Sequence, residues 1–448
     1  MNRICCLAAL TLVFVTSWVN APAGAESPSP TFLVTGEPVP EWFTPIFDGQ
    51  TLSGWIARPH MDPSELAAMD EQARADQESE WMTDAMTHWV VQDDELVNDG
   101  AGPYLVSEAN YGDYELIVDY QTVSRADSGI YLKGCPQVQI WDYTDPAKFE
   151  IGSNLGSGGL WNNSAGAPGK DPFVLADKPF GEKNRFFIRQ IGSRTTVYLN
   201  GKLVVDNAIM ENYWDRESPL PPTGPIILQT HGGEIRWSNL AVHELTPEEA
   251  NTFLDAREKD SFTSIFNGED LDGWQGETDS YEVKDGAIRC KKGEGGNLLT
   301  QKEYANFVAR VEFRLPEAGN NGLAIRSPLG GDAAYQAMCE IQTLDTSHPN
   351  YEGLDPRQAH GSAYGMVAAR QGYLREPGVW NFQEVTVNGS RVSVELNGNT
   401  ILDADLAEVT EYLDNKEHPG KNRTSGFFGF AGHNDAVEYR NISIKELP

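Results

Sequence analysis

The chain has 448 residues, of which 34 are basic and 66 are acidic, and its formal net charge is −32. This charge argues against nucleic acid and anionic lipid surfaces as partners, because both bind basic protein surfaces. The length exceeds that of one ordinary domain, so more than one domain is expected.

Residues 1–25 have the features of a secretory signal peptide. Arg3 precedes an apolar run from Ile4 to Val19, and small residues follow, ending at Ala25. A membrane anchor is the alternative reading, but the run is shorter than the about 20 residues of a spanning helix. We expect cleavage near Ala25, a secreted or periplasmic protein and no membrane insertion.

Two long segments, 40–245 and 261–448, contain the same landmarks in the same order. The matching stretches share residue type and spacing: 47–55 with 266–274, 127–131 with 320–324, 197–201 with 394–398, and 237–240 with 439–442. A period near 200 residues indicates a duplicated domain and not a solenoid of short repeats. Residues 246–260 form the linker, and Thr246-Pro247-Glu248-Glu249 predicts the start of a short helix there.

Inside each repeat, short alternating runs predict strands. Asn200-Gly201 and Asn397-Gly398 separate such runs and are strong hairpin signals. Many strands with regular turns predict an all-β fold of two tandem sandwiches or jelly rolls. The first repeat also has an insertion, 56–88, whose residues 62–87 are expected to be helical. The insertion either packs on the sandwich rim or forms a lid or partner surface.

The sharpest constellation lies in the second repeat, where 338–345 has the pattern of a strand. Glu340 and Gln342 alternate and so share one face, which Asp345 reaches only if the register shifts. Carboxylates supply acid and base functions, and an amide binds hydroxyls, so this face is a candidate sugar site. The alternative is an ordinary strand with its polar side chains toward solvent.

Further candidates lie on neighbouring segments. Arg326 ends the preceding run, where it pairs with Glu340, polarises a ligand oxygen or forms a structural ion pair. His360 and Tyr364 follow in a polar loop, the kind of segment that often carries function. His433 heads the last strand and His231 has the same place in the first repeat, either as a site residue or as a turn-fixing one.

The first repeat has amides where the second has an acid. Gln137 stands at the position of Glu340, while Gln139 and Asp142 match Gln342 and Asp345. An amide cannot act as a general base, so the second repeat is the better candidate for chemistry. Trp161, in a Gly-rich loop, offers either a face for sugar C–H groups or plain packing.

Other catalytic signatures are missing from the sequence. It contains no phosphate-binding Gly loop, nucleophile elbow, HExxH motif or dense calcium-binding ladder. Cys135, Cys290 and Cys339 have no tight spacing and are expected to be buried free thiols. No cofactor is certain, although Asp, Glu and His side chains leave a divalent metal ion open.

These landmarks together resemble the 3-keto-disaccharide hydrolase domain family, in two copies that cover nearly the whole mature chain. The marks are the opening motif that ends in Gly-Trp, the strands from Gly129 to Lys133 and from Gly322 to Arg326, and the Glu340-x-Gln342-x-x-Asp345 strand. The resemblance implies a concanavalin A-like jelly roll in each repeat. It adds Lys133, which matches Arg326, to the substrate-binding candidates.

The resemblance also implies cleavage of glycosides whose sugar carries a 3-ketone. The ketone acidifies the C2 proton, so a base removes it and the C1 oxygen leaves by elimination, with water added later. The roles are shared among a few candidates: Glu340 or His360 as the base, Arg326 or a metal at the enolate, and Asp345, His360 or Tyr364 at the leaving group. An upstream sugar 3-oxidoreductase would have to supply the substrate.

Two other functions remain open. A non-catalytic, lectin-like protein needs only the two concave sandwich faces. A conventional glycosidase requires the Glu340 and Asp345 carboxyls about 5–5.5 Å apart for retention or about 6.5–9.5 Å apart for inversion.

Overall fold

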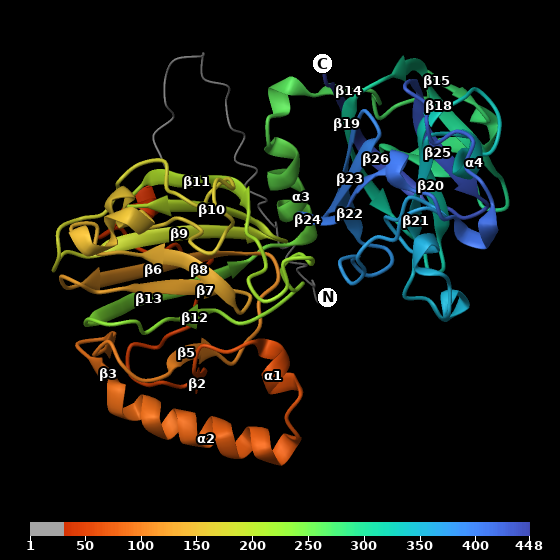
Figure 1. Cartoon of the computed structure of the whole chain (residues 1–448). Coiled ribbons are helices and arrows are strands. Elements are labelled where there is room, and N and C mark those ends of the chain that lie inside the picture. The colour runs from red at the N-terminus through yellow and green to blue at the C-terminus, as the bar shows by residue number, and fades with distance from the viewer. Residues whose placement is uncertain (1–30) are drawn as a thin grey trace, which may run out of the picture.

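The computed structural model describes residues 31–448, so the expected leader and its cleavage near Ala25 lie outside the described residues. Figure 1 shows two β-sandwiches side by side, with the helix α3 (Pro247–Ala256) between them. In each sandwich, a large sheet faces a sheet of five strands.

The first repeat is built from strands between residues 44 and 244. Its eight-stranded sheet has the order β11 (Lys202–Ile209), β10 (Arg194–Leu199), β9 (Asn184–Ile191), β6 (Tyr114–Thr122), β13 (Ile235–Glu244), β4 (Glu95–Asn98), β3 (Trp89–Gln92), with β1 (Thr44–Pro45) on β13. Its five-stranded sheet has the order β2 (Trp55–Arg58), β5 (Tyr104–Ser107), β12 (Ile227–Leu228), β7 (Ser128–Leu132), β8 (Cys135–Ile140).

The second repeat is built from strands between residues 263 and 446. Its eight-stranded sheet has the order β16 (Tyr281–Lys284), β17 (Ala287–Cys290), β26 (Glu438–Glu446), β19 (Phe307–Arg314), β22 (Trp380–Asn388), β23 (Arg391–Leu396), β24 (Asn399–Asp405), with β14 (Thr263–Ser264) on β26. Its five-stranded sheet has the order β15 (Trp274–Gly276), β18 (Gly295–Tyr304), β25 (Gly426–His433), β20 (Asn320–Ser327), β21 (Cys339–Leu344).

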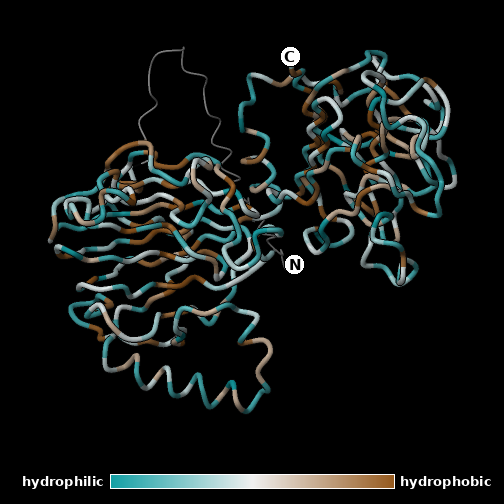
Figure 2. The backbone as a smooth tube through the Cα atoms, in the orientation of Figure 1, coloured by the Kyte–Doolittle hydropathy of each residue, from teal (hydrophilic) through white to brown (hydrophobic). Residues whose placement is uncertain are grey.

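The two repeats therefore have the same topology, strand for strand. Antiparallel pairing joins the strands within these sheets, for example Gly129 with Gln139 in the first repeat and Gly322 with Gln342 in the second. The predicted all-β fold of two tandem jelly-roll sandwiches is confirmed. Each sandwich encloses its own hydrophobic core, and Figure 2 shows hydrophobic residues along the strands of both.

The hairpin prediction is also confirmed at both Asn-Gly pairs. Asn200 and Gly201 connect β10 to β11 with φ angles of 52° and 81°, and Asn397 and Gly398 connect β23 to β24 with 48° and 80°. A two-residue turn of type I′ requires positive φ at both positions, which Asn and Gly adopt at low cost. The two equivalent turns set the register of the two equivalent hairpins.

The insertion of the first repeat folds as two helices, α1 (Pro63–Ala67) and α2 (Glu71–His88). Asp62 and Asp70 cap their N-termini through side-chain bonds to backbone N–H groups. In Figure 1 α2 lies below β2 and β5 and α1 lies beside them, at the lower edge of the first sandwich. Trp81 and Met82 of α2 pack against the core, and most of its other residues are exposed.

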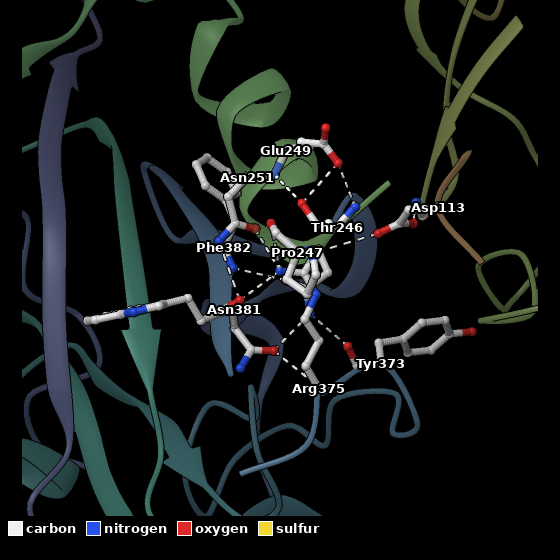
Figure 3. Close-up of polar contacts among 12 residues, drawn as sticks. Asp113, Thr246, Pro247, Glu249, Asn251, Tyr373, Arg375, Asn381 and Phe382 are labelled. Atoms are coloured by element: carbon white, nitrogen blue, oxygen red, sulfur yellow. Dashed lines mark hydrogen bonds and ion pairs between the residues drawn. The ribbon is translucent and has the colours of Figure 1, made fainter. Parts of the chain in front are cut away.

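The linker helix α3 contacts both repeats. Thr246 and Glu249 form the capping box that the sequence predicts. Arg375 of the second repeat donates from Nη1 to Asn251 Oδ1 at 2.7 Å and from Nη2 to Asp113 Oδ2 of the first repeat at 3.4 Å (Figure 3). One partly exposed guanidinium thus connects the helix and the two sandwiches.

Close backbone contacts complete the join between the repeats. The N–H of Ser193 donates to the carbonyl of Gly398 at 3.1 Å, and Arg194 Nε donates to Glu395 at 2.7 Å. A Cβ atom at Gly192 or at Gly398 would overlap backbone atoms of the other repeat. The apolar residues that fill the remaining gap come from α3 and both sandwiches: Ile191, Ala250, Leu254 and Phe382.

Cys135, Cys290 and Cys339 are buried free thiols, as predicted. Among residues 31–448, no helix combines the length and the apolar composition needed to cross a membrane.

Candidate functional site

The candidate site lies on the outer face of the five-stranded sheet, in equivalent positions of the two repeats. Along β21, Cys339 and Ile341 point into the core, so Glu340 and Gln342 point to the opposite face. Along β8, Val138 and Ile140 belong to the core in the same way. Gln137 and Gln139 therefore occupy the matching outer positions.

In the second repeat, Glu340 pairs with His433. Glu340 Oε1 lies 3.2 Å from His433 Nε2, and the two side chains are 3% and 47% exposed. The hydrogen bond to Glu340 raises the pKa of His433 above its ordinary value, although burial opposes the shift. The imidazole of the pair is thus exposed to solvent, and the carboxylate is buried.

Gly322 makes room for that carboxylate. A Cβ atom at this position would overlap Glu340 Oε1 and Cγ, so the acid lies across the bare backbone of β20. Gly129 does the same on β7, where a Cβ atom would lie 2.9 Å from Gln137 Cδ. The glycine in each repeat is therefore required by the side chain that crosses it.

The first repeat holds its own carboxylate–imidazole pair, built from Asp127 and His231. Asp127 Oδ2 lies 3.0 Å from His231 Nδ1 and 2.6 Å from Lys148 Nζ. Gln139 Nε2 donates to Asp127 Oδ1 at 2.8 Å, and Gln137 donates to Gln139. The side chains of Asp127 and His231 are 7% and 61% exposed.

The charges in this cluster are mutually stabilising. Burial alone would raise the pKa of Asp127, but the hydrogen bonds from His231 and Lys148 outweigh it and the pKa is lowered. The hydrogen bond to Asp127 in turn raises the pKa of His231. An ionised acid therefore stands behind an exposed imidazole whose pKa lies above its ordinary value.

The two repeats have exchanged the position of the carboxylate. Asp127 corresponds to Asn320, because Gln139 donates to Asp127 just as Gln342 Nε2 donates to Asn320 Oδ1 at 3.0 Å. Conversely, Glu340 of the second repeat corresponds to Gln137 of the first. Each repeat thus has one acid and one amide at these two positions, and the histidine is common to both.

The sequence pattern indicates Glu340 but not Asp127, which pairs with His231 in the structure. In the sequence, the stretch from Asp127 to Tyr131 is one of the matching segments that identify the duplicated domain. Alignment of this stretch with 320–324 places the acid Asp127 opposite the amide Asn320. This difference is the sequence signal that points to Asp127. Lys148 had no signal of its own, because the 3-10 helix Pro146–Ile151 brings it to Asp127 from 21 residues further along the chain.

His360 lies away from this face, inside the second sandwich. Its ring packs against Phe313 with centroids 5.2 Å apart, and its Nδ1 accepts from the N–H of Leu344 at 3.3 Å. Burial lowers the pKa of His360 to about 3, so the imidazole is neutral at physiological pH. The structure does not bring this predicted catalytic residue to Glu340.

Arg326 and Lys133 are equivalent residues that hold loops. Arg326 Nη1 donates to the carbonyl of Gly389 at 2.7 Å, and Lys133 Nζ donates to the carbonyl of Gly192 at 3.0 Å. Both side chains are buried, both residues have positive φ, and burial lowers the pKa of both. The strand irregularity at each position aims the cation at the rim of the sandwich and not at the outer face.

Asp345 and Asp142 also form an equivalent pair. Asp345 Oδ2 accepts from the N–H of Ala318 at 2.9 Å, and Asp142 Oδ2 accepts from the N–H of Arg125 at 2.7 Å. Each carboxylate fastens the loop before the neighbouring strand. Asp345 is therefore held by other partners than Glu340.

Tyr364 lies beside the second pair, since its N–H donates to the carbonyl of Glu340 at 2.9 Å. Its hydroxyl accepts from Gln358 at 3.1 Å. Trp161 of the first repeat packs edge-on against Trp141, with centroids 5.2 Å apart, and lies 4.4 Å from Lys170 Nζ. Lys148 Nζ in turn lies 5.4 Å from the Trp141 ring, which connects this aromatic pair to Asp127.

Within residues 31–448, no group of three or more His, Cys, Asp or Glu side chains has an arrangement that could hold a metal ion.

Comparison with known proteins adds the following. A family model described as the 3-keto-alpha-glucoside-1,2-lyase-like domain matches residues 42–243 and 261–445. A 3-keto-disaccharide hydrolase of Bacteroides thetaiotaomicron is 25% identical over 229 residues, which span 42% of this chain and 79% of that protein.

Solved structures match one repeat's length of chain. A Parabacteroides distasonis protein described as a glycosyl hydrolase is 24% identical, with a TM-score of 0.38 over 43% of this chain and 96% of its own. A carbohydrate-binding module of Bacillus subtilis is 12% identical, with a TM-score of 0.27 over 39% of this chain and 96% of its own.

Proposed function

The chain belongs to the 3-keto-alpha-glucoside-1,2-lyase-like domain family, and we propose that it cleaves 3-keto-glycosides by elimination across C1 and C2. At the family level it is a carbohydrate-active, glycoside-cleaving hydrolase. The observation that carries the finer proposal is the exposed imidazole held by a buried carboxylate on the outer face of each sandwich.

The reaction needs a base near C2 and a positive group near the ketone oxygen. Removal of the C2 proton breaks the C2–H bond and gives an enolate, whose electrons form the C1=C2 bond as the C1–O bond breaks. The departing oxygen takes up a proton, and water then adds across C1=C2. The sum is hydrolysis, so a lyase-type first step is compatible with a hydrolase outcome.

The first repeat offers groups for each of these roles. Asp127 binds His231 Nδ1, which leaves Nε2 to take the C2 proton. Lys148 has three N–H donors, so while one binds Asp127 another can bind the enolate oxygen. The imidazolium formed in the first step is the acid that protonates the departing oxygen.

The second repeat offers the same pair on a more crowded face. Ala333 of the short helix α4 (Ala333–Gln336) packs there against Leu299, Ala324 and Ala431. Glu340 has His433 as its hydrogen-bond partner, with no lysine in the place of Lys148 among the described contacts. We therefore assign the chemistry to Asp127 and His231, and the rival assignment is the pair of Glu340 and His433.

The proposal has two implications outside the site. The 3-ketone has to be made by an enzyme that oxidises the C3 hydroxyl of a glycoside, so a sugar 3-oxidoreductase must act first. Export by the leader also stays a prediction. Mass measurement of the protein from its native host should show an N-terminus at Glu26 or close by, and a retained leader would contradict it.

The test is incubation of the full chain with a 3-keto-glucoside beside its unoxidised parent. We expect release of the aglycone from the keto compound alone. Cleavage of both compounds would support a conventional glycosidase. Binding of a sugar without turnover of either compound would support a lectin-like protein.

The elimination step has its own readout. In deuterated water, a C2 proton removed and replaced on the enzyme appears as deuterium at C2 of the released sugar. Absence of deuterium there would rule out proton removal from C2 and leave direct hydrolysis.

A further inference from the structure

A pocket of about 250 Å³ lies on the outer face of the first sandwich. Its floor comes from β5, β7 and β12, and its wall from the segment 58–66, which leads into α1 and belongs to the insertion. Four rings line it: His60, Tyr104, Tyr131 and Trp214. The role proposed above does not use this pocket.

The four rings pack against one another, and we call this group of four the aromatic box. His60 lies 5.0 Å from Trp214 between ring centroids and 6.1 Å from Tyr131, and Tyr104 lies 5.7 Å from Tyr131. Most of these contacts are edge-on, the arrangement that aromatic rings favour. Leu66, Val106 and Ile227 add apolar surface to the lining.

Most polar atoms of the four rings already have hydrogen-bond partners. His60 Nδ1 lies 2.9 Å from the Tyr131 hydroxyl, and Trp214 Nε1 donates to the carbonyl of Gly134 at 3.0 Å. Gln229 Nε2 donates to the Tyr104 hydroxyl at 3.5 Å. Burial lowers the pKa of His60, so its ring is neutral at physiological pH. The four rings thus offer few free partners for the hydroxyls of a pyranose, and their faces suit a flat apolar ring. Arg58, whose Nε has no hydrogen-bond partner in the structure, and Asn110 add polar groups to the lining beside the rings.

The pocket lies on the same face of the sheet as the pair of Asp127 and His231. Asp127, Gly129 and Tyr131 alternate along β7 and so share the outer face. Gln229, which bonds to Tyr104, lies two residues before His231 on the segment that follows β12. His60 is also near enough to His231 for the charge of that imidazole to contribute, after burial, to its lowered pKa.

The second repeat does not reproduce the box. By strand register, Tyr131 corresponds to Ala324 and Tyr104 corresponds to Asn297. Ala333 packs at Ala324, and the insertion that supplies His60 and Leu66 has no counterpart there. The pocket is thus a feature of the first repeat.

We propose that this pocket binds the leaving group of the substrate, and that the leaving group is an aromatic aglycone. The inference rests on the proposed function, since it places the bond to be cleaved between the pocket and His231. The volume agrees with one or two fused rings, because a cavity of about 150 Å³ holds benzene and drug-sized ligands need about 300–1,000 Å³. The preferred substrates are 3-keto-glycosides of phenolic compounds.

The experiment compares 4-nitrophenyl and methyl glucosides, as both anomers, by calorimetric titration of the full chain. Neither compound carries a 3-ketone, so binding is measured without turnover. We expect the aryl glucoside of one anomer to bind about 10- to 100-fold tighter than its methyl counterpart, the amount expected from burial of one ring.

Three variants locate the effect. Leu66→Trp should fill the pocket and Trp214→Leu should remove a wall, and each should bring the aryl-to-methyl affinity ratio close to one. Phe173→Leu, at an aromatic residue that is 64% exposed, is the matched control and should keep the ratio of the wild type. Two pocket variants are used so that a folding defect in one leaves the other decisive.

The outcomes separate this inference from the proposed function. Equal affinities in the wild type, or no binding of either compound, would overturn the inference, and so would an aryl preference that survives both pocket variants. Cleavage of a 3-keto-glucoside without any aryl preference would leave the function standing and end the inference. An aryl preference without such cleavage would keep the pocket and end the function.

Discussion

The outer faces of the two sandwiches carry the same imidazole but keep its carboxylate on different strands. In the first repeat the acid is Asp127, just before β7, and in the second it is Glu340, on β21. The amides Gln137 and Asn320 occupy the two positions that the acids leave free. A carboxylate can therefore reach the histidine from either of two neighbouring strands, and the histidine is the constant part of the site.

The residues around the carboxylate–imidazole pair differ more between the two repeats than the pair itself does. Asp127 has a lysine and an amide beside its histidine, and an aromatic pocket lies along the same face. In the second repeat, Ala333 packs on the same face of the sheet that carries Glu340. Both repeats thus have a carboxylate–imidazole pair, while access to the pair and its charged neighbours differ between them.

Replacement of the two histidines should give the largest contrast between the repeats. We expect His231→Gln to lower kcat by about 10²–10⁴-fold, the usual contribution of general acid–base catalysis. His433→Gln, the matched control, should leave kcat within about threefold of the wild type, because a surface group away from the reacting atoms contributes little. Steady-state assays on a 3-keto-glucoside make the comparison, and a reversed result would move the chemistry to the second repeat.

Asp127→Asn should give a smaller effect with a distinctive pH dependence. It removes a hydrogen bond to a charged partner, which is worth about 1.5–3 kcal/mol and predicts a loss of about 10- to 100-fold in kcat. Because Asp127 raises the pKa of His231, its loss lowers that pKa. A base works only when deprotonated, so the acid limb of the kcat/KM profile should move to lower pH. An unmoved limb would show that His231 is not the titrating base.

Alanine at the two strand glycines should test how each repeat seats its side chain. Gly322→Ala would push Glu340 away from His433, whereas Gly129→Ala would displace the uncharged Gln137 and leave Asp127 with His231. Overpacking of this kind costs about 1–3 kcal/mol. Calorimetry should show lower stability for both, and NMR titration should show a lowered pKa for His433 only in the first variant. An unchanged His433 would mean that Glu340 adapts in place.

The smallest expected effect is that of Glu340→Gln, which copies Gln137 of the first repeat into the second. Its size is nearly unchanged, so folding should be preserved, and kcat should stay within about threefold of the wild type because the first repeat is untouched. The same steady-state assay measures it. A loss of about 10²–10⁴-fold would instead identify Glu340 as the proton-transfer group.

Local patterns were enough to predict the fold, and only part of the site. The Asn-Gly turns and the alternation of Glu340 with Gln342 depend on neighbouring residues, so the sequence indicated the hairpins and the shared face. Arg326 shows where this reasoning ends, because its positive φ turns the side chain away from the face that alternation alone would give it. His360 and Asp345 are placed by loops whose paths no periodic pattern describes.

The pair of Asp127 and His231 could not be found by local reasoning, since residues more than a hundred positions apart form it. The acid of the first repeat also stands at a different position from that of the second, because Gln137 is opposite Glu340 and Asp127 is opposite Asn320.

The join between the repeats has a consequence for how the protein unfolds. Separation of the sandwiches would leave Arg194 and Glu395 without each other, break the backbone bond at Ser193 and Gly398, and expose Ile191, Leu254 and Phe382 to water. Loss of one sandwich therefore withdraws support from the other, and heating should melt both halves in a single cooperative transition. A single transition would show that the two copies of the fold behave as one thermodynamic unit, so that damage to either copy destabilises both; two separate transitions would contradict it.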